Sequence, residues 1–326
     1  MIDRRAFLGT LAGGLIAAPL AAKAQQAGKV YRVGVVLEGG PYSATVEGLR
    51  DGLKELGLED GKQLVFHVRD TKGDLKAVET AARSLEAEKV DLIYAVNTSV
   101  TLATKRATTK VPIVFYAGTD PLSVGLIQSF NKPGGRLTGV SGQLTDTSAK
   151  RLELLKEIIP KLHRVVTFYN PDNPVAHQGI TLTRDAARRL NVELVERPVT
   201  SVEALRAGVE ALKQGEADAF FYVGDAMVGS QTDLIVDVTR AKRLPAMFSS
   251  KHAVVRGALA AYGESFYALG RLAAKQVQRV LLGADPGTIP VEQFDRPEFV
   301  INLKTAKALG LTIPPSLLAR ADQVIE

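Results

Sequence analysis

Polar residues in the loops after the expected strands are of types that hold a small molecule. Several of these loops pair a hydroxyl group with a helix that begins at once, as at Thr98 and Ser99. Free backbone N–H groups at a helix start, backed by the helix dipole, favour a carboxylate or another anion, although simple helix capping is the alternative for each loop. Asp120 and Asp225 could instead accept hydrogen bonds from an amine or hydroxyl of the ligand. The loop residues expected to bind a ligand are Thr98, Ser99, Thr119, Asp120, Asn170 and Asp225.

Tyrosines near strand ends form a second set of candidates, because a ring there can cover the apolar body of a ligand. Tyr42, Tyr116, Tyr169 and Tyr262 all fall at strand ends or loop starts. Each ring could equally close the core of a sheet and leave its hydroxyl group at the surface. We select Tyr42 and Tyr262 as expected ligand contacts.

The sequence lacks the patterns that carry catalysis. The histidines have no metal-like spacing, and there is no Gly-x-Ser-x-Gly elbow and no glycine-rich phosphate loop. The absence of cysteine excludes zinc-thiolate sites and cysteine nucleophiles. We therefore predict no catalytic residue, no metal and no cofactor, and a protein that is not an enzyme. The histidines are His67, His163, His177 and His252.

The first 24 residues have the three parts of a bacterial signal peptide. Arg4 and Arg5 precede a weakly apolar run over 9–22, and Ala22-Lys23-Ala24 is a small-x-small cleavage site. The arginine pair and Lys23 beside the cut favour the twin-arginine route over the Sec route, which remains the alternative. About 14 apolar residues are too few for a membrane span, which needs roughly 20. We expect cleavage after about Ala24 and a periplasmic protein.

Composition is that of a globular protein without a lipid anchor or a nucleic-acid surface. The chain is 46% hydrophobic and 23% charged, with a net charge of +6. Lysine and arginine are scattered among acidic residues, whereas nucleic-acid binding requires a clustered basic face. The lack of cysteine also excludes a lipid-modified residue after the signal.

Short apolar runs alternate with amphipathic stretches along the rest of the chain. Continuous apolar strands between helices indicate parallel sheets covered on both faces, with ligands at the carboxyl ends of the strands. Strands are expected at 33–37, 64–68, 92–96, 113–116, 165–169, 192–195, 219–223 and 246–248. Helices are expected at 44–56, 75–88 with Asp74 as N-cap, 100–108, 180–190, 264–282, and from the capping box at 200–203 to 213.

The two halves of the chain resemble each other in sequence. Residues 90–94 (VDLIY) resemble 217–221 (ADAFF), and 111–115 (VPIVF) resemble 244–248 (LPAMF). Such matches at similar offsets predict two similar lobes, with chance similarity among strands as the alternative. Segments 137–142 and 259–263 are expected to cross between the lobes and form a hinge.

The predicted fold is α/β, with two Rossmann-like lobes on parallel sheets joined by a multi-segment hinge. Lobe one should hold residues 30–140 and about 264–282. Lobe two should hold residues 141–262 and about 283–326. Two lobes, a hinge and an export signal together describe a clamp that captures a solute.

Motifs spread over nearly the whole chain point to one protein family. The tail at 300–316 reads VINLKTAKALGLTIPPS, and 151–156 reads RLELLK. Asp120-Pro121 follows the fourth expected strand, and 170–174 reads NPDNP. These stretches, with the signal motif DRRAFLG, resemble the ABC-transporter substrate-binding family of the type I periplasmic-binding fold. The tail is the most specific of them.

The resemblance implies an extracytoplasmic receptor that delivers a small molecule to a membrane permease and ATPase pair. Relatives are similar to tryptophan- and other amino-acid-binding proteins, and some paralogues take aromatic or fatty carboxylates. Its ligand contacts fall on the six loop residues given above. Asn97-Thr98-Ser99 stands where the family often has Gly-Thr-Pro, and Gly224 where many members have proline, so ligand identity is not transferred.

We therefore expect a periplasmic receptor of an ABC importer that binds a small organic, carboxylate-bearing solute between closing lobes. It is expected to be monomeric and to bind no nucleic acid. One alternative is a periplasmic sensor that uses the same clamp to inform a signalling partner. A second is an exported enzyme, for which the sequence offers no nucleophile, acid–base pair or metal set.

Overall fold

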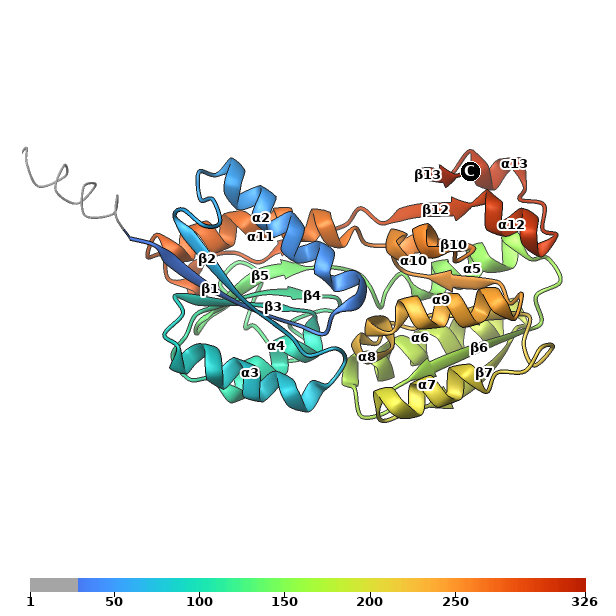
Figure 1. Cartoon of the computed structure of the whole chain (residues 1–326), viewed down its shortest axis with the longest axis horizontal. Helices are drawn as coiled ribbons and strands as arrows, with labels where there is room; N and C mark the ends of the chain where they lie inside the picture. Colours follow the sequence, from blue (N-terminus) through green and yellow to red (C-terminus); the bar gives the residue numbers. More distant parts are fainter. Residues whose placement is uncertain (1–28) are drawn as a thin grey trace, which may run out of the picture.

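Residues 29–326 form two α/β lobes that lie side by side, each built on its own sheet (Figure 1). These are the residues that the computed structural model describes, and the predicted signal peptide lies outside them. The predicted α/β architecture with two sheets of mainly parallel strands is confirmed. The predicted strands are all found, and their ends differ from the predicted ones by at most three residues.

The first sheet has six parallel strands in the order β11-β5-β4-β3-β1-β2. Helices α2 and α11 cover one face, and α3 and α4 cover the other (Figure 1). Its strands are β1 (Tyr31–Leu37), β2 (Leu64–Asp70), β3 (Leu92–Val96), β4 (Ile113–Ala117), β5 (Leu137–Ser141) and β11 (Glu292–Gln293). Its helices are the 3-10 turn η1 (Gly40–Tyr42), α2 (Ser43–Glu55), α3 (Leu75–Ala87), α4 (Thr98–Ala107), α11 (Phe266–Leu281) and the 3-10 turn η2 (Pro286–Thr288).

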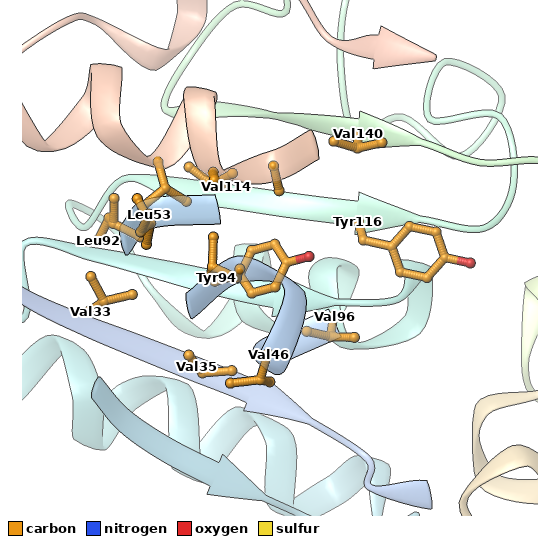
Figure 2. Packing of buried hydrophobic residues seen from close by; sticks show 14 of the residues in the cluster. Val33, Val35, Val46, Leu53, Leu92, Tyr94, Val96, Val114, Tyr116 and Val140 are labelled. Carbon is orange, nitrogen blue, oxygen red and sulfur yellow. The ribbon is translucent and has the colours of Figure 1, made fainter. Parts of the chain in front are cut away.

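Buried strands such as β3 supply both faces of this lobe's core. Leu92, Tyr94 and Val96 pack under α2 and α11 (Figure 2), whereas Ile93 and Ala95 pack against α3 and α4. Successive side chains of a strand point to opposite faces, so a strand covered on both sides is apolar throughout. This is why β3 and β4 were readable as continuous apolar runs.

Helices α2 and α11 approach so closely that backbone meets backbone. A Cβ added at Gly270 would lie 1.9 Å from the carbonyl oxygen of Thr45, and one added at Gly48 would lie 2.0 Å from that of Tyr267. Glycine at both positions therefore sets the spacing of this helix pair. The pair joins the N-terminal part of the lobe to a segment more than 200 residues later.

The second sheet has seven strands in the order β13-β12-β10-β9-β8-β6-β7. All its pairings are parallel except that of β10 with β12. Its strands are β6 (Arg164–Tyr169), β7 (Glu193–Pro198), β8 (Ala219–Phe221), β9 (Ala246–Phe248), β10 (Ala260–Gly263), β12 (Glu298–Asn302) and β13 (Gln323–Ile325). Its helices are α5 (Ser148–Ile158), α6 (Pro174–Leu190), α7 (Val202–Glu210), α8 (Ala226–Ser230), α9 (Thr232–Ala241), α10 (Lys251–Arg256), α12 (Leu303–Leu309) and α13 (Pro315–Leu318).

Helix starts follow their capping residues. Asp74 is the predicted N-cap of α3, and its side chain accepts hydrogen bonds from two backbone N–H groups of the first turn. The capping box predicted at 200–203 is shifted by one residue, because Ser201 has the extended backbone and accepts from the N–H of Ala204. Helix α6 begins six residues earlier than predicted, since Asn173 caps it and Pro174 fits its first turn.

Three segments cross between the lobes rather than the two predicted. The chain passes from β5 to α5, from β10 to α11, and from β11 to β12. The predicted placement of residues after 282 in lobe two is wrong up to β11, because Glu292 and Gln293 pair with β5 in the first sheet. A strand of two residues has no periodic pattern, so it could not be predicted from the sequence.

Candidate ligand-binding site

The loops at the carboxyl ends of the two sheets meet through side-chain hydrogen bonds. Ser99, at the start of α4, donates to Oδ1 of Asn173 at 3.0 Å. Thr119, after β4, donates to Oε1 of Gln178 in α6 at 2.6 Å. Both pairs join lobe one to lobe two. The two lobes are therefore in contact through polar side chains. A permanent interface, by contrast, would be mainly apolar.

Three cavities lie along this contact, and predicted ligand residues line two of them. An open one of about 610 Å³ is lined by Glu38, Ser99, Asn170 and Asn173, together with the starts of α3 and α7. A much smaller one, of about 10 Å³, lies deeper between Tyr42, Thr98 and residues of lobe two. That volume suits about one water molecule. An organic solute at this depth requires the lobes to separate.

Thr98 and Ser99 open α4, as predicted, but neither caps it. The cap is Asn97, whose Oδ1 accepts from the N–H of Val100 at 3.0 Å. Thr98 is buried, and its Oγ1 accepts from the N–H of Gly118 at 3.1 Å. Thr98 therefore ties the ends of β3 and β4 together. Ser99 faces the second lobe.

Asp225 is buried at the junction of β8 and α8. It caps α8 by accepting from the N–H of Val228 at 3.0 Å, and it accepts from the N–H of Asn170 at 3.0 Å. The Nδ2 of Asn173 lies 3.4 Å from the same carboxylate. Burial raises the pKa of Asp225 above its ordinary value, and the backbone donors oppose that rise. Asn170 and Asp225, both predicted ligand residues, are thus brought together.

Tyr42 lies in the core of lobe one and reaches lobe two with its hydroxyl group. Its ring packs at 4.9 Å from that of Phe266, and its side chain is 1% exposed. Its hydroxyl oxygen lies 3.5 Å from that of Tyr222, which donates to the backbone oxygen of Asp225. This tyrosine packs in the core and also borders the deep cavity, and its contact with a ligand stays a prediction.

Asp120 and Tyr262 lie apart from the other predicted residues. Asp120 is exposed, and its carboxylate accepts from the N–H of Leu122 at 3.0 Å. Tyr262 is half-buried in β10, where its ring meets Phe299 edge-on. Neither lines any of the three interlobe cavities. The structure gathers Tyr42, Thr98, Ser99, Thr119, Asn170 and Asp225 at the lobe contact.

Glu38 lies at the lobe contact but is not among the predicted ligand residues, and the same holds for Asn173 and Gln178. Glu38 follows β1, is 1% exposed, and its Oε2 accepts from Nδ2 of Asn97 at 3.1 Å. Burial, followed by the charge of Asp225, raises the pKa of Glu38 to about 8. A signal was present: a single carboxylate ends the continuous apolar run of β1, directly before Gly39 and Gly40.

A fully buried arginine holds the crossing segments of lobe two. Arg151 in α5 donates to the backbone oxygens of Tyr222 and Tyr262, at 2.9 Å each, and to that of Leu144 at 3.2 Å. Its Nη2 also donates to Thr147. Among the described residues no carboxylate lies within 4 Å of its guanidinium group, and burial lowers its pKa to about 10. This side chain ties the first crossing to the ends of β8 and β10.

A buried glutamate joins two of the crossings to lobe one. Glu264, between β10 and α11, accepts from the hydroxyl group of Tyr116 and from the N–H of Gln143. Burial raises the pKa of Glu264 to about 7. Arg151 and Glu264 together make the hinge a hydrogen-bonded polar cluster.

Across residues 29–326, the helices lack the length and apolar character of a membrane span. In the same range no three metal-binding side chains gather into a possible metal site. The predicted absence of a cofactor stays a prediction.

Comparison with known proteins places this geometry in context. The family model described as ABC transporter substrate binding protein matches residues 31–325. The chain is 30% identical over 265 residues to the tyrosine-binding protein of Clostridioides difficile (strain R20291), covering 81% of this chain and 76% of that protein.

Two solved structures are similar over most of their length. One is the ABC domain in complex with L-Trp from Streptococcus pneumonia, with 27% identity and a TM-score of 0.81. The other is a conserved domain protein from Vibrio cholerae, with 29% identity and a TM-score of 0.82. Each match covers 91% of this chain and 100% of the other. Proteins of 14–16% identity share the fold alone, and the predicted periplasmic-binding-protein type I fold is confirmed.

Proposed function

The chain belongs to the ABC transporter substrate-binding protein family, and on that premise we propose that it is a periplasmic receptor of an ABC importer. It captures a small organic solute between its lobes and delivers it to a permease and ATPase complex. It is exported by its N-terminal signal and acts as a monomer. The observation that carries the proposal is the lobe contact itself, which consists of polar side chains from loops of both sheets.

The proposed ligand is an amino acid or a similar carboxylate with an aromatic or apolar body. Two relatives support this class, since one is named for tyrosine and another was solved with L-Trp. The starts of α4 and α6 meet at Ser99 and Asn173, and helix starts favour a carboxylate. In the closed protein these two side chains satisfy each other, so a ligand carboxylate replaces the bond that they share.

Closure on the ligand is the proposed working motion. The lobes rotate about the three crossing segments, as parallel segments allow when a few backbone angles change. The ligand favours the closed form by its greater affinity for it. Polar contacts such as that of Thr119 with Gln178 stabilise closure only modestly, at about 0.5–1.5 kcal/mol each. The equilibrium can therefore respond to a ligand.

The first test is a thermal-shift screen of residues 25–326 against amino acids, aromatic acids, short fatty acids and sugars. A true ligand at a hundredfold over its dissociation constant stabilises the protein by about 2.7 kcal/mol. The screen is repeated with Ser99→Ala and, as a matched control, with Ser84→Ala. Ser84 is exposed, and its hydroxyl group donates to the half-buried Glu88. A ligand whose binding is weakened by the first variant alone supports the site. A folded protein that binds nothing in the panel, or binds equally well in both variants, contradicts it.

A further inference from the structure

Glu38 presents a buried carboxylate to the lobe contact, and one of its two oxygens accepts no hydrogen bond from the described residues. It lines the open cavity of about 610 Å³ together with Ser99 and Asn173. Its Oε2 accepts one hydrogen bond, from Asn97. Within residues 29–326, its Oε1 accepts none from a side chain or the backbone. A buried ionised carboxylate is strongly unfavourable unless a cation or several donors meet it.

The charges that face Glu38 are of its own sign. Asp225 faces it from the start of α8, Asp74 from the start of α3, and Asp70 from the end of β2. Each of these carboxylates makes ionisation of Glu38 harder. The local field therefore favours a positive group at this point.

The cationic side chains around the same cavities are not paired with Glu38. Lys76 and Arg106 line the open cavity, and Lys72 and Arg206 line the neighbouring one. Among the described residues no lysine or arginine lies within 4 Å of Glu38. Arg106 pairs with Glu79, and Arg206 donates to Gln231. None of these side chains supplies a positive charge to Glu38, so that place is left to a cationic group of the ligand.

Asn97 fixes the direction in which Glu38 points. Its Oδ1 caps α4 at Val100, so its Nδ2 is left to donate to Glu38. Its backbone angles, φ 82° and ψ 166°, lie in a region normally reserved for glycine. Such strain persists where surrounding structure requires it, and it clusters at ligand sites.

The loop that follows Glu38 lies in close contact with lobe two. Gly40 has a φ of 58°, and a Cβ there would lie 2.7 Å from the backbone oxygen of Gly229. A Cβ on Gly39, whose φ is 74°, would lie 2.8 Å from the carboxylate of Asp70. Only glycine fits this approach at both positions. The sequence Glu-Gly-Gly thus places one carboxylate at the seam between the lobes.

We infer that Glu38 is the group that binds the ammonium of the ligand, oriented by Asn97. The ligand is then a zwitterion, with its carboxylate at the starts of α4 and α6 and its cationic nitrogen on Glu38. This inference rests on the proposed function. It narrows the ligand class to α-amino acids and excludes acids that lack an amine.

The test is isothermal titration calorimetry with three matched ligands: L-tyrosine, 3-(4-hydroxyphenyl)propionate, which lacks the amine, and tyramine, which lacks the carboxylate. The wild-type protein is expected to prefer L-tyrosine over the des-amino acid by about 10- to 100-fold, the range of a charge-assisted hydrogen bond. Glu38→Gln should abolish that preference, and Glu153→Gln, an exposed control on α5, should keep it. Asn97→Gly relieves the backbone strain but removes the amide, so it should keep the fold and reduce the preference.

The outcomes separate this inference from the proposed function. If Glu38→Gln is folded and still prefers L-tyrosine as the wild type does, Glu38 does not bind the ammonium and the receptor proposal stands. The inference about Glu38 also fails, and the receptor proposal stands, if the wild type binds the des-amino acid as well as L-tyrosine or if its ligand proves to have no amine. If the wild type binds none of the three and nothing in the wider panel, the receptor proposal fails and this inference falls with it.

Discussion

Closure of the ligand-free protein should depend on pH through Glu38. In the closed form burial raises the pKa of this carboxyl from its ordinary 4.5 to about 8, whereas an open cleft would hydrate it. The closed form therefore binds a proton more tightly than the open form. Closure without ligand is favoured below pH 4.5 and loses that advantage as the pH rises through 8.

The magnitude follows from the two pKa values. One pKa unit corresponds to about 1.4 kcal/mol, so raising the pH from 5 to 8 disfavours closure by roughly 3–4 kcal/mol, or a few hundredfold. Glu38→Gln removes this dependence, because an amide does not titrate in the range. Glu264 in the hinge also has a raised pKa, about 7. The pH dependence of closure is therefore measured in Glu264→Gln as well, so that the contribution of Glu264 is known separately from that of Glu38.

The assay is fluorescence energy transfer across the cleft mouth. The chain has no cysteine, so Lys76→Cys and Glu203→Cys provide two unique labelling sites, one from each lobe on the open cavity. The labelled protein should show higher transfer at pH 5 than at pH 8, and labelled Glu38→Gln should show little change. Equal transfer at both pH values in the parent, or the same pH response after Glu38→Gln, would refute the reasoning.

Three further predictions concern stability, each measured by urea unfolding. Arg151→Met should lower the free energy of unfolding by about 3–5 kcal/mol, because several buried carbonyl groups lose their hydrogen-bond donor. Arg151→Lys should be no more stable than Arg151→Met. An unchanged midpoint of unfolding would show that Arg151 does not stabilise the hinge. Gly270→Ala should cost about 1–3 kcal/mol or more, since its Cβ would meet the oxygen of Thr45, and a neutral result would mean that α2 and α11 can part freely. Asp225→Ala should lower the free energy of unfolding by about 0.5–2 kcal/mol, because α8 loses the cap on the N–H of Val228. Asp225→Asn can still cap the helix and should lower it less. Equal losses in the two variants would mean that Asp225 stabilises the protein by something other than capping.

Strand periodicity carried the fold prediction because these strands are buried on both faces. Runs such as β3 and β9 were predicted to the residue. Prediction was poorer where the pattern was short or irregular. The two residues of β11 carry no periodicity. Helix α6 begins at Pro174, after its cap Asn173, and so starts before the apolar pattern from which it was predicted.

The candidate site was predicted in part, for a related physical reason. Loops after parallel strands must gather at one sheet edge, and Ser99, Thr119 and Asp225 do meet at the lobe contact. The same rule failed for Asp120, because its carboxylate accepts from the N–H of Leu122 in its own turn and stays at the surface. Tyr262 lies on a crossing strand, and the neighbouring β12 packs against its ring.

The sequence by itself determined the two-lobed α/β plan and the family, because apolar periodicity and local motifs are written in adjacent residues. Only the tertiary structure decided that Glu38 is buried where the charge of Asp225 acts on it, and that Arg151 meets carbonyl groups of the distant residues Tyr222 and Tyr262. Burial and electrostatic environment depend on which parts of the chain pack together. A glutamate at the end of a strand looks the same in the sequence whether it is exposed to water or buried among other acidic groups.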